Sequence, residues 1–348
     1  MRQPERVSSH LWSAYLLLVA LFSTLAASFG QEPVVAPTAK GYSFDAGVAF
    51  LVEASADWRE ERGCVTCHTN GWGLAAQPVI DPGSSEVAKG RAFAQGYLTS
   101  YITGEAKATR QYGSVEGLVA TTAFLALSDA RSGDVVHPAT RQGLDHAWEL
   151  LDESGTWEAW LRCNWPPFES DLNYGPTLML IALGELEDSA GLEEADRSGA
   201  ARLIEYLEQN APASLHDKAM RLWAAKHWSQ TGASGVKRLK AWRAELLAAR
   251  GEDGGWSMAS LAGPNWKRDG GGPQTATSEA YPTAFCTYVL LQTGMKRSHV
   301  VMKSGLRWLR EHQRDDGSWY TRSPRRDGKH YISRAATAYA LMALATKR

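Results

Sequence analysis

The stretch KSGLRWLREHQRDDGSW, residues 303–319, carries a pattern that the rest of the chain repeats. Leu306 and Leu309 fall on one face of a predicted helix that ends near Gln313, because apolar residues three or four positions apart share a helix face. The letters DDG that follow have the composition of a turn, and Trp319 comes directly after it. The stretch therefore predicts an amphipathic helix, a tight turn and a tryptophan, in that order.

Weaker copies of this order recur along the chain. The segments 45–58, 143–157 and 240–256 keep both the amphipathic helix and a terminal tryptophan, whereas 86–102 and 201–215 keep only the helix. Each copy is followed by a segment that is apolar almost all round, which predicts a helix buried on every side. These buried segments are 69–80, 117–130, 174–186, 217–228, 281–294 and 335–347.

Exposed and buried helices thus alternate with a period of about 40–65 residues, as in stacked or closed arrays of helix pairs. We predict an all-α protein with about six outer and six inner helices, closed as an α/α toroid over residues 43–348. An open solenoid is the alternative architecture.

The stretch 303–319 resembles the QW motif of the squalene–hopene cyclase and oxidosqualene cyclase family, whose toroid the protein prenyltransferases share. The matching residues are Trp308, Leu309, Gln313, Gly317 and Trp319. The resemblance implies an α/α toroid with a central cavity, in which the glutamine and tryptophan tie outer helices together. The copy at 240–256 has Arg250 in place of the glutamine. The sequence contains no D-x-D-D motif, with which class II cyclases protonate an alkene, so cyclisation is in doubt.

A second motif, CVTCH at residues 64–68, has the form in which haem is attached covalently. The two thiols of such a motif form thioethers with the haem, and the histidine becomes an axial ligand of the iron. The sequence therefore predicts haem c on Cys64 and Cys67, with His68 as an iron ligand.

Other readings of the motif remain open. Exported proteins allow a disulfide between the two cysteines, and zinc could take the motif's three side chains together with Cys163 or Cys286. The match could also be accidental. The sixth ligand of a haem iron is equally open between His216, His137 and Met258, or none. A filled sixth position implies electron transfer, whereas an open one permits chemistry on small molecules.

The N-terminus predicts export, which covalent haem attachment requires. Residues 1–30 have the basic start, the short apolar run and the small residues of a signal peptide, and 31–42 have the composition of a linker. The protein is therefore expected to be periplasmic or otherwise extracytoplasmic. If residues 11–27 are not removed, they would anchor it to the membrane. The net charge of −1 argues against a nucleic-acid-binding protein.

Polar residues stand where several buried helices begin, so they are expected to ring one mouth of the toroid. The candidates for substrate contact are Asp171, Asp217, Glu279 and Arg334. Tyr174 and Tyr281 occupy equivalent places and could shape the pocket. Acidic residues also favour helix N-termini for purely structural reasons.

We therefore expect an exported c-type haem protein with a redox or electron-transfer role near the cavity. It would work with a redox partner protein or an apolar, lipid-like ligand. The alternatives are a cyclase-like or lyase-like enzyme in which the cysteine motif is structural, and a toroid that binds a lipid or glycan without catalysis.

Overall fold

The computed structural model describes residues 35–106, 114–133, 135–162, 165–228 and 233–347. Residues 36–348 belong to one compact unit. The predicted signal segment 1–30 and the start of the predicted linker lie outside the described residues. None of the described helices is both long and apolar enough to span a membrane.

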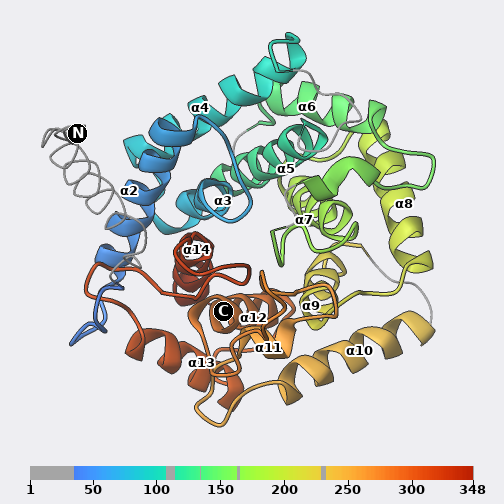
Figure 1. Ribbon diagram of the computed structural model, residues 1–348. Coiled ribbons are helices and arrows are strands. Elements are labelled where there is room, and N and C mark those ends of the chain that lie inside the picture. The colour runs from blue at the N-terminus through green and yellow to red at the C-terminus, as the bar shows by residue number, and fades with distance from the viewer. Residues whose placement is uncertain (1–34, 107–113, 134, 163–164, 229–232, 348) are drawn as a thin grey trace, which may run out of the picture. The chain divides into compact units, whose positions relative to one another are not determined.

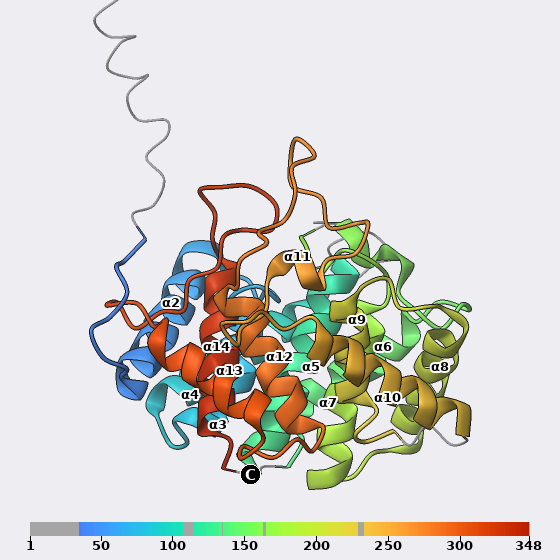
Figure 2. The same cartoon turned by 90° about the horizontal axis from the view of Figure 1, so that it is seen from below.

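The compact unit consists of two rings of helices (Figures 1 and 2). The outer helices are α2 (Phe44–Arg62), α4 (Ser85–Ile102), α6 (Pro138–Glu149), α8 (Glu194–Gln209), α10 (Ala233–Ala248) and α13 (Val300–Glu311). The inner helices are α3 (Asn70–Ile80), α5 (Ser114–Ser132), α7 (Tyr174–Ser189), α9 (Leu215–Ala224), α12 (Ala280–Gln292) and α14 (Ile332–Ala345). The short α11 (Met258–Leu261) and a 3₁₀ helix, η2 (Glu158–Arg162), lie in connections. The α/α toroid with six outer and six inner helices, predicted from the sequence, is confirmed.

The division into rings follows from the helix faces. In α12, every residue from Ala280 to Leu291 is buried, whereas α13 buries only one stripe that includes Leu306 and Leu309. Burying apolar area stabilises the fold by about 25 cal/mol per Å², so a helix that is apolar all round gains most at the centre. The striped helices take the periphery, where their polar faces meet water.

Three tryptophans fasten the turn after an outer helix to that helix in the same way. The indole N–H groups of Trp157, Trp256 and Trp319 donate to carbonyl oxygens ten positions earlier, at 3.0, 2.8 and 2.7 Å. These three are the terminal tryptophans that the sequence repeat predicts after α6, α10 and α13. The resemblance to QW motifs thus describes a real structural unit of this chain.

The last of these units closes the ring from α13 back to α2 (Figure 1). The Gln313 side chain accepts a hydrogen bond from the Ser43 backbone N–H and donates one to the Ser43 carbonyl, each at 2.8 Å. Gly317 has a φ of 85°, and a Cβ atom there would stand 2.1 Å from the Ala46 carbonyl oxygen. Only glycine fits this turn, because other residues disfavour that backbone region and their Cβ atom would clash with the Ala46 carbonyl.

The seam between α8 and α10 is built differently. Ala213 stands after α8 at the position where α6, α10 and α13 are followed by a tryptophan. Trp242 of α10 stands at the helix position that is a glycine in α13. The large side chain at this seam therefore comes from α10 and not from the turn after α8. A surface pocket of about 260 Å³ remains there, lined in part by Leu207 and Trp242.

At the end where the inner helices finish, Arg131 of α5 joins four other inner helices. Its guanidinium forms two 2.7 Å hydrogen bonds with Glu185 of α7 and one of 2.8 Å with the Ala75 carbonyl of α3. It also contacts the Tyr288 hydroxyl of α12 and the Met342 sulfur of α14, each at 3.3 Å. This clamp, at the far end from the cysteine motif, was not predicted from the sequence.

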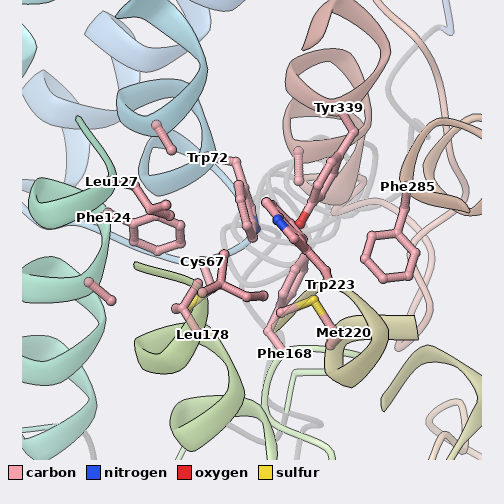
Figure 3. Packing of buried hydrophobic residues seen from close by; sticks show 14 of the residues in the cluster. Cys67, Trp72, Phe124, Leu127, Phe168, Leu178, Met220, Trp223, Phe285 and Tyr339 are labelled. Atoms are coloured by element: carbon pink, nitrogen blue, oxygen red, sulfur yellow. The ribbon is translucent and has the colours of Figure 1, made fainter. Parts of the chain in front are cut away.

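Aromatic side chains fill the axis of the toroid (Figure 3). The ring centroid of Trp72 lies 4.5 Å from that of Tyr339 and 5.9 Å from that of Trp223. All three side chains are fully buried. The central cavity implied by the family resemblance is therefore occupied along these rings by the protein's own side chains.

Candidate functional site

The cysteine motif forms the link between α2 and α3, where the first inner helix begins. Gly63 ends α2 in a left-handed conformation, with φ 61°, and turns the chain toward the motif. Asn70 then holds the loop from both sides. Its side-chain oxygen accepts from the Thr66 N–H and its amide group donates to the Cys64 carbonyl, each at 3.0 Å. The link is therefore an ordered loop at one rim of the toroid.

The two thiols of the motif lie in different surroundings. Cys64 is half-buried, and Cys67 is only 2% exposed, lying close to Trp72 and Leu178 (Figure 3). Burial raises the pKa of the Cys64 thiol. Neither cysteine is in a disulfide, so the disulfide alternative does not describe this structure.

The zinc alternative requires metal-binding side chains that converge on one point. Within the described ranges, no three His, Cys, Asp or Glu side chains do so. Cys286 is fully buried within α12, and Cys163 lies outside the described residues. The described residues therefore do not assemble the zinc site with Cys286, whereas the version with Cys163 stays a prediction.

His68 lies in a box of three aromatic rings. The centroid of its imidazole is 5.6 Å from Trp58, 5.0 Å from Trp165 and 5.9 Å from Tyr331, and all three contacts are edge-to-face. Burial, assisted by the nearby charge of Arg334, lowers the pKa of His68 to about 3. The imidazole is therefore neutral at physiological pH, which is the form that binds metal ions.

Arg334 lies against the same box. Its guanidinium carbon stands 5.4 Å from the Trp58 ring centroid and 5.7 Å from that of Tyr331. Its Nη1 atom is buried and makes no hydrogen bond with any described residue, and no described carboxylate forms an ion pair with it. Burial lowers the pKa of this guanidinium.

The donor set of this rim fits a covalent haem. Two thiols outside any disulfide flank a loop that ends in a neutral histidine, and apolar rings surround its imidazole. A haem on His68 would take space beside the imidazole that Trp165 and Tyr331 now fill, so these two rings would have to move aside.

The structure does not bring the proposed sixth ligands to His68. His216 is buried, with its Nε2 atom hydrogen-bonded to the Tyr281 hydroxyl at 2.9 Å. His137 caps the start of α6, and its backbone N–H donates to Asp129 near the end of α5. It thus lies at the opposite end of the inner helices. Met258 begins α11, which packs on α9 and α12.

Two of the candidate acids share one network at the start of α7. Asp171 accepts from the Asn173 N–H, while the Asn173 amide donates to Asp217, each at 2.8 Å. Asp217 also forms a 2.9 Å ion pair with Arg221, which indicates a structural role. Burial, followed by the charge of Asp217, raises the pKa of Asp171 to about 6.

Glu279 stands immediately before α12, and burial raises its pKa to about 7. Its Oε1 atom accepts from the Arg322 N–H at 2.9 Å. Nearby, Tyr281 pairs with His216, whereas Tyr174 packs edge-to-face on Phe168. The rim thus holds carboxyl groups that can carry a proton near neutral pH.

The raised pKa of Glu279 predicts a specific pH dependence of stability. A carboxyl group that binds its proton more tightly when folded stabilises the protein fully below pH 4.5, and this contribution is lost as the pH rises through about 7. The free energy of unfolding should fall by about 1.4 kcal/mol per pH unit in that window. In urea titrations, Glu279→Gln should weaken this slope and the exposed control Glu252→Gln should not. Equal slopes for both variants would show that Glu279 titrates normally.

The sequence predicted the motif but not the aromatic box around it. The sequence repeat predicts Trp58 as the terminal tryptophan of its first copy, at 45–58. In the structure it lies inside α2 and faces His68, so that assignment was wrong. Trp165 and Tyr331 come from connections distant in sequence, and no local pattern could have placed them beside His68.

No protein-family model and no curated protein sequence matches this chain. Solved structures do match its fold. An apo type II terpene cyclase from Scytonema has a TM-score of 0.51 at 15% identity, covering 87% of this chain and 96% of the cyclase. The unsaturated glucuronyl hydrolase from Bacillus sp. GL1 has 0.52 at 13%, covering 85% and 96%. A glycosyl hydrolase family 88 protein from Bacteroides vulgatus has 0.53 at 8%, covering 87% and 99%. At these identities the comparisons show that the chain shares the α/α toroid fold of these enzymes, and the fold alone.

Proposed function

We propose that this chain is an exported c-type haem protein, in which a haem is attached through Cys64 and Cys67 at one rim of the toroid and His68 is an iron ligand. The observation that carries the proposal is the state of His68. Its imidazole is neutral, forms no hydrogen bond with a described residue and lies in an aromatic box next to both cysteines.

The residues of the rim would then act as follows. Asn70 holds the loop so that the two thiols and the imidazole keep a fixed order. Trp58 and its neighbouring rings surround the imidazole, and burial among them favours its unprotonated form. A bound haem would supply one-electron redox chemistry. The proposal includes a small ligand or a redox partner that approaches the haem from the rim.

Replacing both motif cysteines tests the proposal. After export together with a haem-attachment system, the wild-type protein should keep haem staining on a denaturing gel, because thioether bonds survive denaturation. Cys64→Ser/Cys67→Ser should lose the staining completely. Cys286→Ala is the matched control, because it removes a cysteine that lies in the core, and it should stain like the wild type. Staining that persists in the double variant would place the attachment elsewhere.

A second candidate function is acid catalysis at the same rim by Glu279. Its pKa, raised to about 7, leaves it partly protonated near neutral pH, and a general acid is most effective when its pKa lies near the working pH. An acid this weak suits protonation of an ether or enol-ether oxygen better than that of an isolated alkene. This candidate therefore favours a sugar-like substrate over a terpene. The solved structures of similar fold include both a glucuronyl hydrolase and a terpene cyclase.

The two candidate functions differ in whether the activity requires haem. A hydrolase or lyase should turn over an unsaturated uronide without haem and should lose that turnover in Glu279→Gln. Turnover by the haem-free protein that Glu279→Gln abolishes would support the second candidate. Turnover that survives the substitution, or is absent in both, would exclude it.

A further inference from the structure

We propose that Arg334 is a receptor for a carboxylate ligand at the rim of the toroid. In a loaded protein the carboxylate would be a haem propionate, and in a haem-free protein it would belong to a free acid that enters the same site. The first case rests on the proposed haem function, whereas the second does not. The inference starts from a guanidinium that forms no ion pair with a described carboxylate and has a buried Nη1 atom without a hydrogen bond.

Arg334 is half-buried, but its Nη1 atom is shielded from water. Elsewhere in the chain, Arg131 and Arg221 each bind a carboxylate, at 2.7 and 2.9 Å. Arg334 has no such partner among the described residues, and its Nη1 atom is buried without a hydrogen bond. An unmade hydrogen bond at a buried charged group costs about 1–3 kcal/mol or more, so the arrangement is favourable only if something else supplies the acceptor.

The surroundings of Arg334 present a second, matching feature. Arg334 belongs to the first turn of α14, and its guanidinium stacks over Trp58. Helix N-termini carry a partial positive charge, which adds to the charge of the side chain. The electrostatic partners nearest to it on α2 are Asp57, Glu61 and the like-charged Arg62. Neither acid forms an ion pair with Arg334, so its guanidinium can still accept a carboxylate as a direct partner.

The geometry also indicates the kind of carboxylate. A guanidinium offers two parallel N–H groups, which bind a carboxylate in a fork. The ring of Trp58 lies against its plane, and in the haem-free protein that of Tyr331 does so too. Trp58 also contacts His68, so the ligand's body should be a flat or ring-shaped group that packs against aromatic surfaces. A porphyrin and a sugar acid both meet this description.

Arg62 provides a matched control. Its guanidinium carbon also lies over Trp58, at 5.7 Å, but it stands on the exposed end of α2. Substituting Arg62 removes a cation from the same ring without touching the buried Nη1 atom. Arg334→Lys is the conservative variant, which keeps the charge but loses the fork.

The first arm of the experiment uses the haem-loaded protein. In Arg334→Gln the reduction potential of the haem should fall, because loss of a nearby cation favours the more positively charged ferric state. Arg334→Lys should restore part of the potential and Arg62→Gln should change it less. The amount of haem per chain and the thermal midpoint should stay near wild type, which separates this effect from misfolding.

The second arm uses the haem-free Cys64→Ser/Cys67→Ser protein, titrated with glucuronate in a calorimeter. A free-acid site predicts binding that Arg334→Gln weakens by about tenfold or more and that Arg62→Gln leaves unchanged. If Arg334→Gln changes only the reduction potential, the site is assigned to a haem propionate. If it weakens the binding of glucuronate, the site is assigned to a free carboxylate. If Arg334→Gln behaves like Arg62→Gln in both arms, the inference is overturned. If no haem attaches at all, the haem function fails and the second arm alone decides the carboxylate site.

Discussion

Arg131→Met should destabilise the protein by about 3–5 kcal/mol, because removing one partner leaves Glu185 as a buried, unpaired charge. The side chains of both residues are largely shielded from water, with 6% and 13% exposure. Burial alone would raise the pKa of Glu185, and the charge of Arg131 brings it below its usual value. Since domains are stable by only about 5–15 kcal/mol, urea unfolding should show a large fall in the free energy of unfolding.

Two comparisons identify the clamp as the cause. The double variant Arg131→Met/Glu185→Leu should recover much of the lost stability, because replacing both members of a buried pair by apolar residues is often nearly neutral. Arg197→Met removes an arginine from an exposed ion pair with Glu187 and should change the free energy of unfolding little. A loss in Arg131→Met no larger than in Arg197→Met would contradict the clamp.

Trp319→Ala should cost a similar amount, about 3–5 kcal/mol, because it removes a fully buried indole and leaves a cavity. The indole fills the seam between α13 and α2, where it donates to the Leu309 carbonyl and lies against Gly47. Since this seam joins the two ends of the compact unit, its loss should open the ring there. Hydrogen exchange should become faster at the start of α2 and the end of α13.

Trp319→Phe separates the two contributions of the indole. The variant keeps most of the apolar volume but loses the hydrogen bond, so it should cost about 1 kcal/mol for that bond plus a smaller packing loss. Val300→Ala, at a position 70% exposed on α13, is the control and should have little effect. Equal losses in Trp319→Ala and Val300→Ala would exclude ring closure through this residue.

The sequence predicted the two rings of helices well, because the predictions relied on period and burial. Leu306 and Leu309 mark a striped helix by their spacing, and α12 and α14 are apolar on all sides. These features are visible within a single segment of the sequence, so each helix could be assigned as outer or inner without knowing its neighbours. The exchange of Ala213 and Trp242 at one seam also follows from the repeat once its register is known.

The candidate site was only partly predictable. Cys64, Cys67 and His68 form a local motif, and the candidate acids could be placed from helix starts. The box around His68, in contrast, combines Trp58 with residues about 100 and 270 positions further along the chain. Such contacts depend on how the ring closes. The same is true of Arg131, which in the sequence is an ordinary basic residue in the last turn of a helix.

The central claim is that a haem is bonded to the rim of this toroid, and peptide mapping by mass spectrometry tests it most directly. The protein should be exported from cells that also mature a known c-type cytochrome, then digested and analysed. The account predicts that the peptide containing Cys64 and Cys67 carries the mass of one haem, with both thiols blocked to alkylation. Unmodified, alkylatable cysteines in that peptide, in cells where the control cytochrome is fully loaded, would contradict it.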